Sequence, residues 1–177
     1  MSDTSIRERT AADDARLDTL YREAFPDEDL RPVVHALHTG EAKILSLVAV
    51  RGEKVVGNVI FTECSLPDHA EPLSLLAPLG VTPAEQRQGI GTKLVEEGFR
   101  RLTAAGIAKV FVLGDPAYYG RLGFEVERAV ATPQPIPEDW AGAWQSISLG
   151  RASGGAAAFA GTLDVPDPWR NPALWAP

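Results

Sequence analysis

The sequence has few of the residues from which disulfides and metal sites are built. It contains one cysteine, Cys64, and three histidines, His35, His38 and His69, among 177 residues. A single cysteine cannot form an internal disulfide, which fits a reducing compartment, so we expect a cytoplasmic protein. These four residues do not follow the spacing of a zinc site, so we expect no metal.

Basic residues and long apolar runs are also scarce. Lysine and arginine number 17 against 24 acidic residues, which gives a net charge of −7. A sequence-independent grip on nucleic acid needs a basic surface, so no nucleic-acid partner is expected, whereas a neutral or cationic small substrate fits. No run approaches the ~20 apolar residues that span a bilayer, and the polar residues 1–14 are no secretory signal, so no membrane partner is expected. The length favours one domain, residues 1–177.

Hydrophobic periodicity predicts strands that alternate with helices. A capping box of Thr10 and Asp13 opens a helix that Pro26 ends, and Asp115 and Pro116 have the residue types of an N-cap and a first helical position. The other predicted helices lie at residues 28–38 and 89–105. Predicted strands lie at residues 5–10, 44–50, 55–64, 73–81, 109–113, 124–128 and 156–165. The order strand, helix, strand from residue 73 to residue 113 predicts a parallel crossover.

The turn Gln86–Thr92 lies between a predicted strand and a predicted helix. Its glycines, Gly89 and Gly91, fall where the first amides of the helix have no intrahelical partner and carry the positive end of the helix dipole. Glycines let a phosphate approach this backbone, which predicts an anion site, and a diphosphate in particular. A P-loop would need a further upstream glycine, and Leu94 is too large for the third small position of a dinucleotide fingerprint.

The surrounding motifs resemble those of the GCN5-related N-acetyltransferase superfamily. They are the run Leu79-Gly80-Val81-Thr82-Pro83, then Gln86-x-x-Gly89-x-Gly91, then Tyr119-x-x-x-Gly123-Phe124. Residues 113–124 are similar to the bacterial YhbS-like subgroup, which has Gly114-Asp115-Pro116 where the superfamily often has an asparagine. The resemblance is strongest over residues 73–128 and weak after about residue 130.

The resemblance implies an α/β fold, with a mixed twisted sheet, helices on both faces and parallel strands that splay at a slot for the cofactor. Acetyl-CoA is the implied acyl donor, its pantetheine arm lying along Leu79 and Val81. Pro78 suits this arrangement, because a proline cannot donate to a ladder and the sheet must open there. The implied diphosphate ligands are the main-chain amides of Gln86, Arg87, Gln88, Gly89, Ile90, Gly91 and Thr92.

Tyr119 is the general acid that the resemblance implies. A phenol with a reference pKa of ~10 is protonated at neutral pH and can donate to a departing thiolate, whose thiol has a reference pKa of ~8.5. The alternative is that Tyr118 and Tyr119 are two packing aromatics. If Tyr119 is the general acid, Tyr118 is a packing residue or a substrate contact.

The general base is less well marked. Glu63 is the side-chain candidate, because it ends a strand that should flank the cofactor slot, and a chain of water molecules is the alternative. Cys64 could form an acyl-cysteine intermediate, although burial as a small hydrophobic residue is the commoner fate of a lone cysteine.

The function we expect is transfer of an acetyl group from acetyl-CoA to the amine of a small molecule by direct attack. Three alternatives stay open: a non-catalytic acyl-CoA-binding module, an enzyme for longer acyl chains or hydroxyl acceptors, and an acetylase of protein lysine or N-terminal amines. The C-terminal part holds all four tryptophans, which we expect to anchor the core and the irregular tail at residues 166–177. A substrate wall or a homodimer contact is their alternative role. They are Trp140, Trp144, Trp169 and Trp175.

Overall fold

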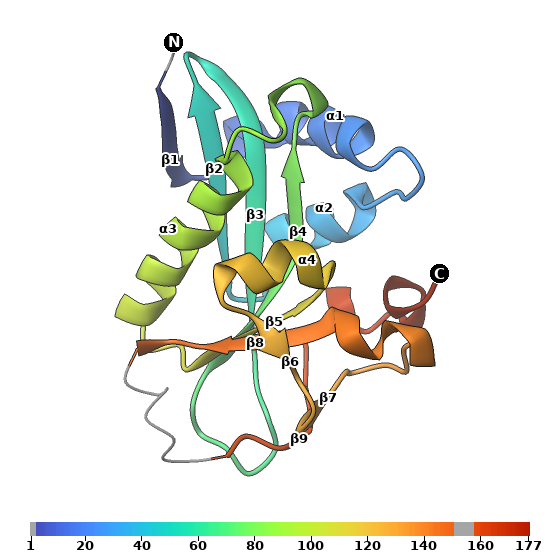
Figure 1. Ribbon diagram of the computed structural model, residues 1–177. Coiled ribbons are helices and arrows are strands. Elements are labelled where there is room, and N and C mark those ends of the chain that lie inside the picture. The colour runs from blue at the N-terminus through green and yellow to red at the C-terminus, as the bar shows by residue number, and fades with distance from the viewer. Residues whose placement is uncertain (1–2, 151–157) are drawn as a thin grey trace. The chain divides into compact units, whose positions relative to one another are not determined.

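The computed structural model describes residues 3–150 and 158–177 (Figure 1). The chain forms two compact units. The first comprises the described residues up to Phe61 together with Ala77–Arg101, and the second comprises Thr62–Leu76 and the described part of Leu102–Pro177. Two strands and one helix run from one unit into the other.

The bounds of the elements are as follows. The strands are β1 (Thr4–Glu8), β2 (Ile44–Arg51), β3 (Lys54–Cys64), β4 (Leu73–Val81), β5 (Lys109–Leu113), β6 (Glu125–Val126), β7 (Val130–Ala131), β8 (Trp144–Ser148) and β9 (Gly161–Thr162). The α-helices are α1 (Asp14–Ala24), α2 (Arg31–Thr39), α3 (Ile90–Ala104) and α4 (Pro116–Tyr119). The 3₁₀ helices are η1 (Ala11–Asp13), η2 (Pro83–Glu85), η3 (Gly120–Leu122), η4 (Glu138–Ala143), η6 (Asp167–Trp169) and η7 (Pro172–Trp175).

The first unit orders its strands β1-β2-β3-β4, and helices pack on both faces of this sheet (Figure 1). A Cβ atom on Gly57 of β3 would lie 3.0 Å from the side chain of Leu94, so α3 packs closely on that face. The next residue, Asn58, accepts a hydrogen bond from the hydroxyl of Tyr21 on α1. Because successive residues of a strand face opposite sides of a sheet, α1 and α3 cover opposite faces, as expected.

The second unit orders its strands β4-β5-β8-β6. Ser74 and Leu75 of β4 pair in parallel with Val110 and Phe111 of β5, which confirms the predicted parallel crossover. Strand β8 pairs antiparallel with β5 from Lys109↔Ser148 to Leu113↔Trp144. The short strands β7 and β9 form a separate parallel pair.

The sequence pattern did not predict β8. Two of its residues, Gln145 and Ser146, are polar yet buried, so the strand lacks an apolar signal. Their polar atoms have partners far along the chain: Gln145 Nε2 donates to the carbonyl of Gly114 at 3.0 Å, and Ser146 Oγ donates to Glu127 at 2.7 Å. Polar side chains can be buried when they make such hydrogen bonds. Hydrophobic periodicity does not reveal a strand that is stabilised in this way.

Two strand predictions for the C-terminal part were wrong. The strand expected at residues 124–128 is confined to Glu125–Val126. Of the strand expected at residues 156–165, the described part forms only Gly161–Thr162 and a single bridge from Asp164 to Ser65, and residues 156–157 lie outside the described residues. The tail contains two short 3₁₀ turns, η6 and η7.

Three of the tryptophans are core anchors, as expected. Trp144, Trp169 and Trp175 are buried, whereas Trp140 is half-buried. The Trp144 ring stacks on Phe111 with centroids 5.5 Å apart and meets Trp175 edge to face at 5.9 Å. Trp175 Nε1 donates to the carbonyl of Trp169 at 2.8 Å, which fastens η7 to η6.

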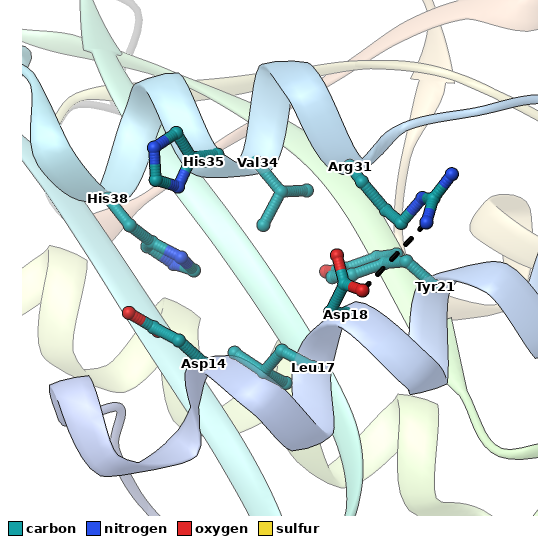
Figure 2. Close-up of a pocket in the computed structure, with 8 residues that line it drawn as sticks. All are labelled: Asp14, Leu17, Asp18, Tyr21, Arg31, Val34, His35 and His38. Atoms are coloured by element: carbon teal, nitrogen blue, oxygen red, sulfur yellow. Dashed lines mark ion pairs between the residues drawn. The ribbon is translucent and has the colours of Figure 1, made fainter.

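A buried polar network joins the sheet to the helices of the first unit. The Tyr21 hydroxyl donates to Asn58 Oδ1 at 2.5 Å, and Asn58 Nδ2 donates to the Leu47 carbonyl at 2.8 Å and to Ser46 Oγ at 3.1 Å. Ser46 Oγ also lies 2.9 Å from His38 Nε2. The network ends at His38 in a hollow between α1 and α2 (Figure 2).

This position holds His38 in its neutral form. The pKa of His38 is lowered to about 4, chiefly by burial and also by the charges of Arg9 and His35, while Asp14 acts in the opposite direction. An unfolded histidine titrates near ~6.5. Between these values the unfolded chain takes up a proton that the folded chain does not, so acid favours unfolding in this window.

We predict that the free energy of unfolding falls as the pH is lowered from about 6.5 towards 4, and that His38→Gln removes part of this fall. Denaturant titrations at pH 7 and pH 5 measure the difference. His35→Gln, at an exposed position on the same helix, should keep most of the fall, because His35 makes the smallest contribution to the pKa shift of His38. An unchanged pH dependence in His38→Gln would show that other groups cause it.

Candidate functional site

The predicted anion-binding turn connects β4 to α3 in the first unit. The chain leaves β4 at Val81, passes through η2 and enters α3 at Ile90, and residues 86–89 are exposed. Arg87 and Gly89 both have positive φ angles, +63° and +81°. A Cβ atom at Gly89 would meet nothing within 4 Å, so its backbone conformation, rather than a lack of space, requires glycine there.

The start of α3 leaves amides available to a ligand. Lys93 N–H donates to the Gly89 carbonyl at 3.0 Å, which is the first hydrogen bond of the helix. The amides of Ile90, Gly91 and Thr92 precede this bond, and such amides have no acceptor within their own helix. The helix dipole adds positive potential at the same place, and the side chains of Arg87 and Lys93 are exposed beside it.

The glutamine side chains of the turn bind back to its own loop. Gln86 Nε2 donates to the Val81 carbonyl at 3.0 Å, and Gln88 Nε2 lies 3.5 Å from the Ala84 carbonyl. Arg51 donates to Gln88 Oε1 at 2.7 Å and pairs with Glu85. The turn therefore offers backbone amides to a ligand, while these side chains hold its shape. Sequence reasoning missed Arg51, because a contact to a residue 34 positions away leaves no local signal.

Leu79 and Val81 lie on the part of β4 that belongs to the first unit. Both are half-buried. Gly80 between them faces α1, since a Cβ atom there would lie 3.1 Å from Leu20 and from Tyr21. Pro78 precedes them, three residues after the last pair that β4 forms with β5, and has no N–H group to extend that ladder. The bond from Ala77 to Pro78 is cis.

Tyr119 lies at the end of α4, in the second unit. The Ala117 amide donates to Asp115 Oδ1 at 2.9 Å, which confirms Asp115 as the N-cap, and Pro116 follows it. Gly123, with a φ of +100°, ends the following turn of η3. Local sequence therefore sets where this tyrosine lies.

Aromatic rings surround Tyr119. Its centroid lies 5.0 Å from that of Tyr118 and 5.5 Å from that of Phe124, both nearly perpendicular to it. Burial raises the pKa of Tyr119, and the neighbouring Tyr118 raises it further. The phenol is therefore protonated at neutral pH, so it can donate a proton but cannot serve as a base.

The ring of Tyr119 rests on Gly114. A Cβ atom at Gly114 would lie 2.4 Å from Cε2 of Tyr119, well inside van der Waals contact. Gly114 cannot easily retreat, because its amide donates to the Ala143 carbonyl at 2.9 Å and its carbonyl accepts from Gln145 at 3.0 Å. The close approach of the ring gives a physical reason for glycine at position 114.

Glu63 lies near the end of β3, in the second unit, between two residues that the C-terminal segment holds. Thr62 Oγ1 accepts from Trp169 Nε1 at 3.1 Å. Ser65 exchanges two backbone hydrogen bonds with Asp164, at 3.0 and 2.8 Å. Glu63 itself is half-buried.

Cys64, next to Glu63, is buried. Burial raises the pKa of its thiol, and the charges of Glu63 and Asp164 raise it further. A thiol that stays protonated is a poor nucleophile, so its surroundings do not suit an acyl-cysteine intermediate.

The hollow between α1 and α2 contains carboxylates that already have partners (Figure 2). Asp14 pairs with Arg9 at 2.6 Å. Asp18 pairs with Arg22 at 3.0 Å and with Arg31 at 3.8 Å. The negative charges of the carboxylates in the hollow are thus nearly neutralised, so the hollow offers little attraction to an ammonium group.

Within residues 3–150 and 158–177, no group of three or more histidine, cysteine or acidic side chains is placed to hold a metal ion. Within the same residues, no helix is both long and apolar enough to cross a membrane.

Comparisons with known proteins give the family. Residues 43–126 match the model of the acetyltransferase (GNAT) domain. The uncharacterized N-acetyltransferase YjhQ of Escherichia coli is 37% identical over 135 residues, covering 73% of this chain and 68% of YjhQ. The E. coli N-acetyltransferase YhbS is 35% identical over 122 residues, covering 68% of this chain and 73% of YhbS.

Solved structures agree with this assignment. The structure of E. coli YhbS in complex with CoA has a TM-score of 0.85, with 28% identity over 97% of this chain and 94% of that one. A GNAT acetyltransferase from Brucella melitensis in complex with acetyl-CoA has a TM-score of 0.76, with 26% identity over 95% of this chain and 99% of that one. The predicted mixed α/β fold and the predicted acyl donor, acetyl-CoA, are confirmed. The chain belongs to the GCN5-related N-acetyltransferase family, is YhbS-like within it, and is an acetyl-CoA-dependent acyltransferase.

Proposed function

We propose that this acyltransferase moves the acetyl group of acetyl-CoA to the amine of a small molecule by direct attack. The observation that carries the proposal is the start of α3, where free amides follow a turn shaped by Arg87 and Gly89. We further propose that residues 1–177 work as one N-acetyltransferase domain.

In this proposal the turn Gln86–Thr92 binds the diphosphate of CoA through its backbone. The amides and the helix dipole supply the positive potential, since the side chains of Gln86 and Gln88 bond to the loop itself. The pantetheine arm runs along Leu79 and Val81 as an added strand. The missing N–H of Pro78 supports this, because β4 cannot continue its ladder to another strand there.

The reaction needs one bond to form and one to break. The neutral amine attacks the thioester carbonyl carbon, a C–N bond forms, and the C–S bond breaks to release CoA as a thiolate. We propose that Tyr119 gives this thiolate its proton. Tyr119 is protonated at neutral pH and therefore has a proton to give, although its raised pKa makes it a weaker acid than a free phenol.

The amine must also lose a proton, and we propose Glu63 as the base that receives it. Its neighbours Thr62 and Ser65 are tied to the C-terminal segment, so the backbone that carries Glu63 is held on both sides. A chain of water molecules is the alternative route.

A screen of small amines and peptides, with thiol release as the readout, tests the acceptor. The net charge of −7 supports a cationic or neutral small amine. Turnover of peptides alone would identify a protein acetylase instead. CoA binding without turnover of any acceptor would identify a binding module, and competition by long-chain acyl-CoA would indicate a longer acyl group.

We predict that Gly91→Glu weakens CoA binding by at least about tenfold, which is roughly 1.4 kcal/mol. The substitution places bulk and a negative charge where the diphosphate should lie. Calorimetric titration with CoA measures the effect. Gly142→Glu adds the same charge at an open position of η4 and is the matched control. Equal CoA affinity in a folded Gly91→Glu protein would refute the diphosphate site.

We predict that Tyr119→Phe lowers turnover by roughly 10²- to 10⁴-fold, the range for loss of a general acid. The ring still packs against Phe124, so CoA affinity and thermal stability should change little. Tyr118→Phe should be mild. Steady-state thiol release measures both variants, and equal small losses would make Tyr119 a packing residue.

We predict that Gly114→Ala lowers turnover by about 10- to 100-fold, the range for a reacting group displaced by about an ångström. The new methyl group overlaps the ring of Tyr119, which must move. Gly120→Ala is the control, because a Cβ atom there meets nothing within 4 Å. Full activity in Gly114→Ala would show that this glycine does not set the position of the tyrosine.

A further inference from the structure

Arg51 connects three separate segments of the first unit. It ends β2, and its guanidinium reaches Thr4 on β1 through Nε at 3.2 Å and Nη2 at 3.1 Å. Nη1 donates to Gln88 Oε1 at 2.7 Å and pairs with the Glu85 carboxylate. The side chain is 25% exposed and that of Glu85 is 27% exposed, so the pair is partly shielded from water.

The two loop contacts bracket the strained part of the turn. Glu85 ends η2 and Gln88 immediately precedes Gly89, so Arg51 holds both sides of Gln86 and Arg87. Arg87 has a positive φ, which a non-glycine residue adopts only when its surroundings enforce it. One planar guanidinium with several fixed donors can hold two acceptors at once, and a lysine ammonium does this less well.

The Arg51–Glu85 ion pair also neutralises a negative charge close to the backbone amides of the turn. An unpaired Glu85 carboxylate would repel an incoming diphosphate, and the guanidinium neutralises it. Exposed ion pairs add little to folding stability. An ordered loop, however, raises affinity, because the ligand no longer has to order it on binding.

We propose that Arg51 is a positioning residue for the diphosphate turn. It acts through Gln88 and Glu85, holding the backbone of residues 85–89 in the form that receives CoA and cancelling the charge of Glu85. This inference rests on the proposed function, in which that turn binds the diphosphate.

The test compares Arg51→Ala and Arg51→Lys by calorimetric titration with CoA. Arg51→Ala should weaken CoA binding about tenfold, a typical effect for bonds to a charged group. Arg51→Lys should recover only part of the loss. With an acceptor in hand, the KM for acetyl-CoA should rise while kcat stays within about twofold. S-acetylpantetheine, which has no diphosphate, should react equally well with the wild type and both variants.

Thr4→Val is the matched control. It removes the acceptor at the other end of Arg51 and leaves the contacts with Glu85 and Gln88 in place. CoA affinity should then stay close to that of the wild type. Equal losses in Thr4→Val and Arg51→Ala would show that Arg51 only fastens β1 to β2, and would overturn the proposal.

Two further results separate this inference from the proposed function. If Arg51→Ala does not fold, Gln88→Ala removes the Arg51–Gln88 contact and leaves the pair with Glu85 in place, so a smaller loss of CoA affinity is expected, and unchanged affinity overturns the positioning role proposed for that contact. If Gly91→Glu weakens CoA binding but Arg51→Ala does not, only the role of Arg51 is wrong. If Gly91→Glu has no effect either, the diphosphate site itself is wrong.

Discussion

The first unit depends on one constraint: α3 must start with its amides open while the rest of the helix is packed against the sheet. Close packing is achieved with glycines, since a Cβ atom on Gly98 of α3 would lie 2.2 Å from the Phe61 ring of β3. Gly57 on β3 likewise makes room for Leu94. The helix axis is therefore fixed by contacts along its length, and its first turn needs no partner of its own. An anion can then bind amides that are already oriented.

Local signals explain which parts could be predicted from the sequence. Strands β4 and β5 and the N-cap Asp115 lie at the predicted residues, because apolar runs and capping residues act over a few positions. Strand β8 was missed, because its buried Gln145 and Ser146 bond to Gly114 and Glu127, 31 and 19 positions away. Arg51 was missed for the same reason. For the candidate site, the sequence predicted the motif residues. It did not predict the residues far along the chain that hold those motif residues in place.

In the C-terminal tail, amino-acid composition predicted which residues are buried, whereas hydrophobic periodicity did not predict the secondary structure. Clustered tryptophans predicted anchors, and three of them are buried. Their indole N–H groups need acceptors once buried, and the Thr62 hydroxyl and the Trp169 carbonyl supply two of these. These bonds order η6 and η7 without the apolar repeat that marks a regular element.

A buried carboxylate, Glu127, reinforces the frame that supports Tyr119 in the second unit. Glu127 accepts from Ser146 on β8 at 2.7 Å, pairs with Lys109 on β5 at 3.2 Å, and accepts from the amides of Ala129 and Val130. Burial alone would raise the pKa of Glu127, but these partners lower it overall, so the charged form is the stable one. That charge adds a side-chain link between β5 and β8 to their backbone ladder. Since β8 also holds Gly114 through Gln145, the surface on which the Tyr119 ring rests belongs to the same strand pair that Glu127 reinforces.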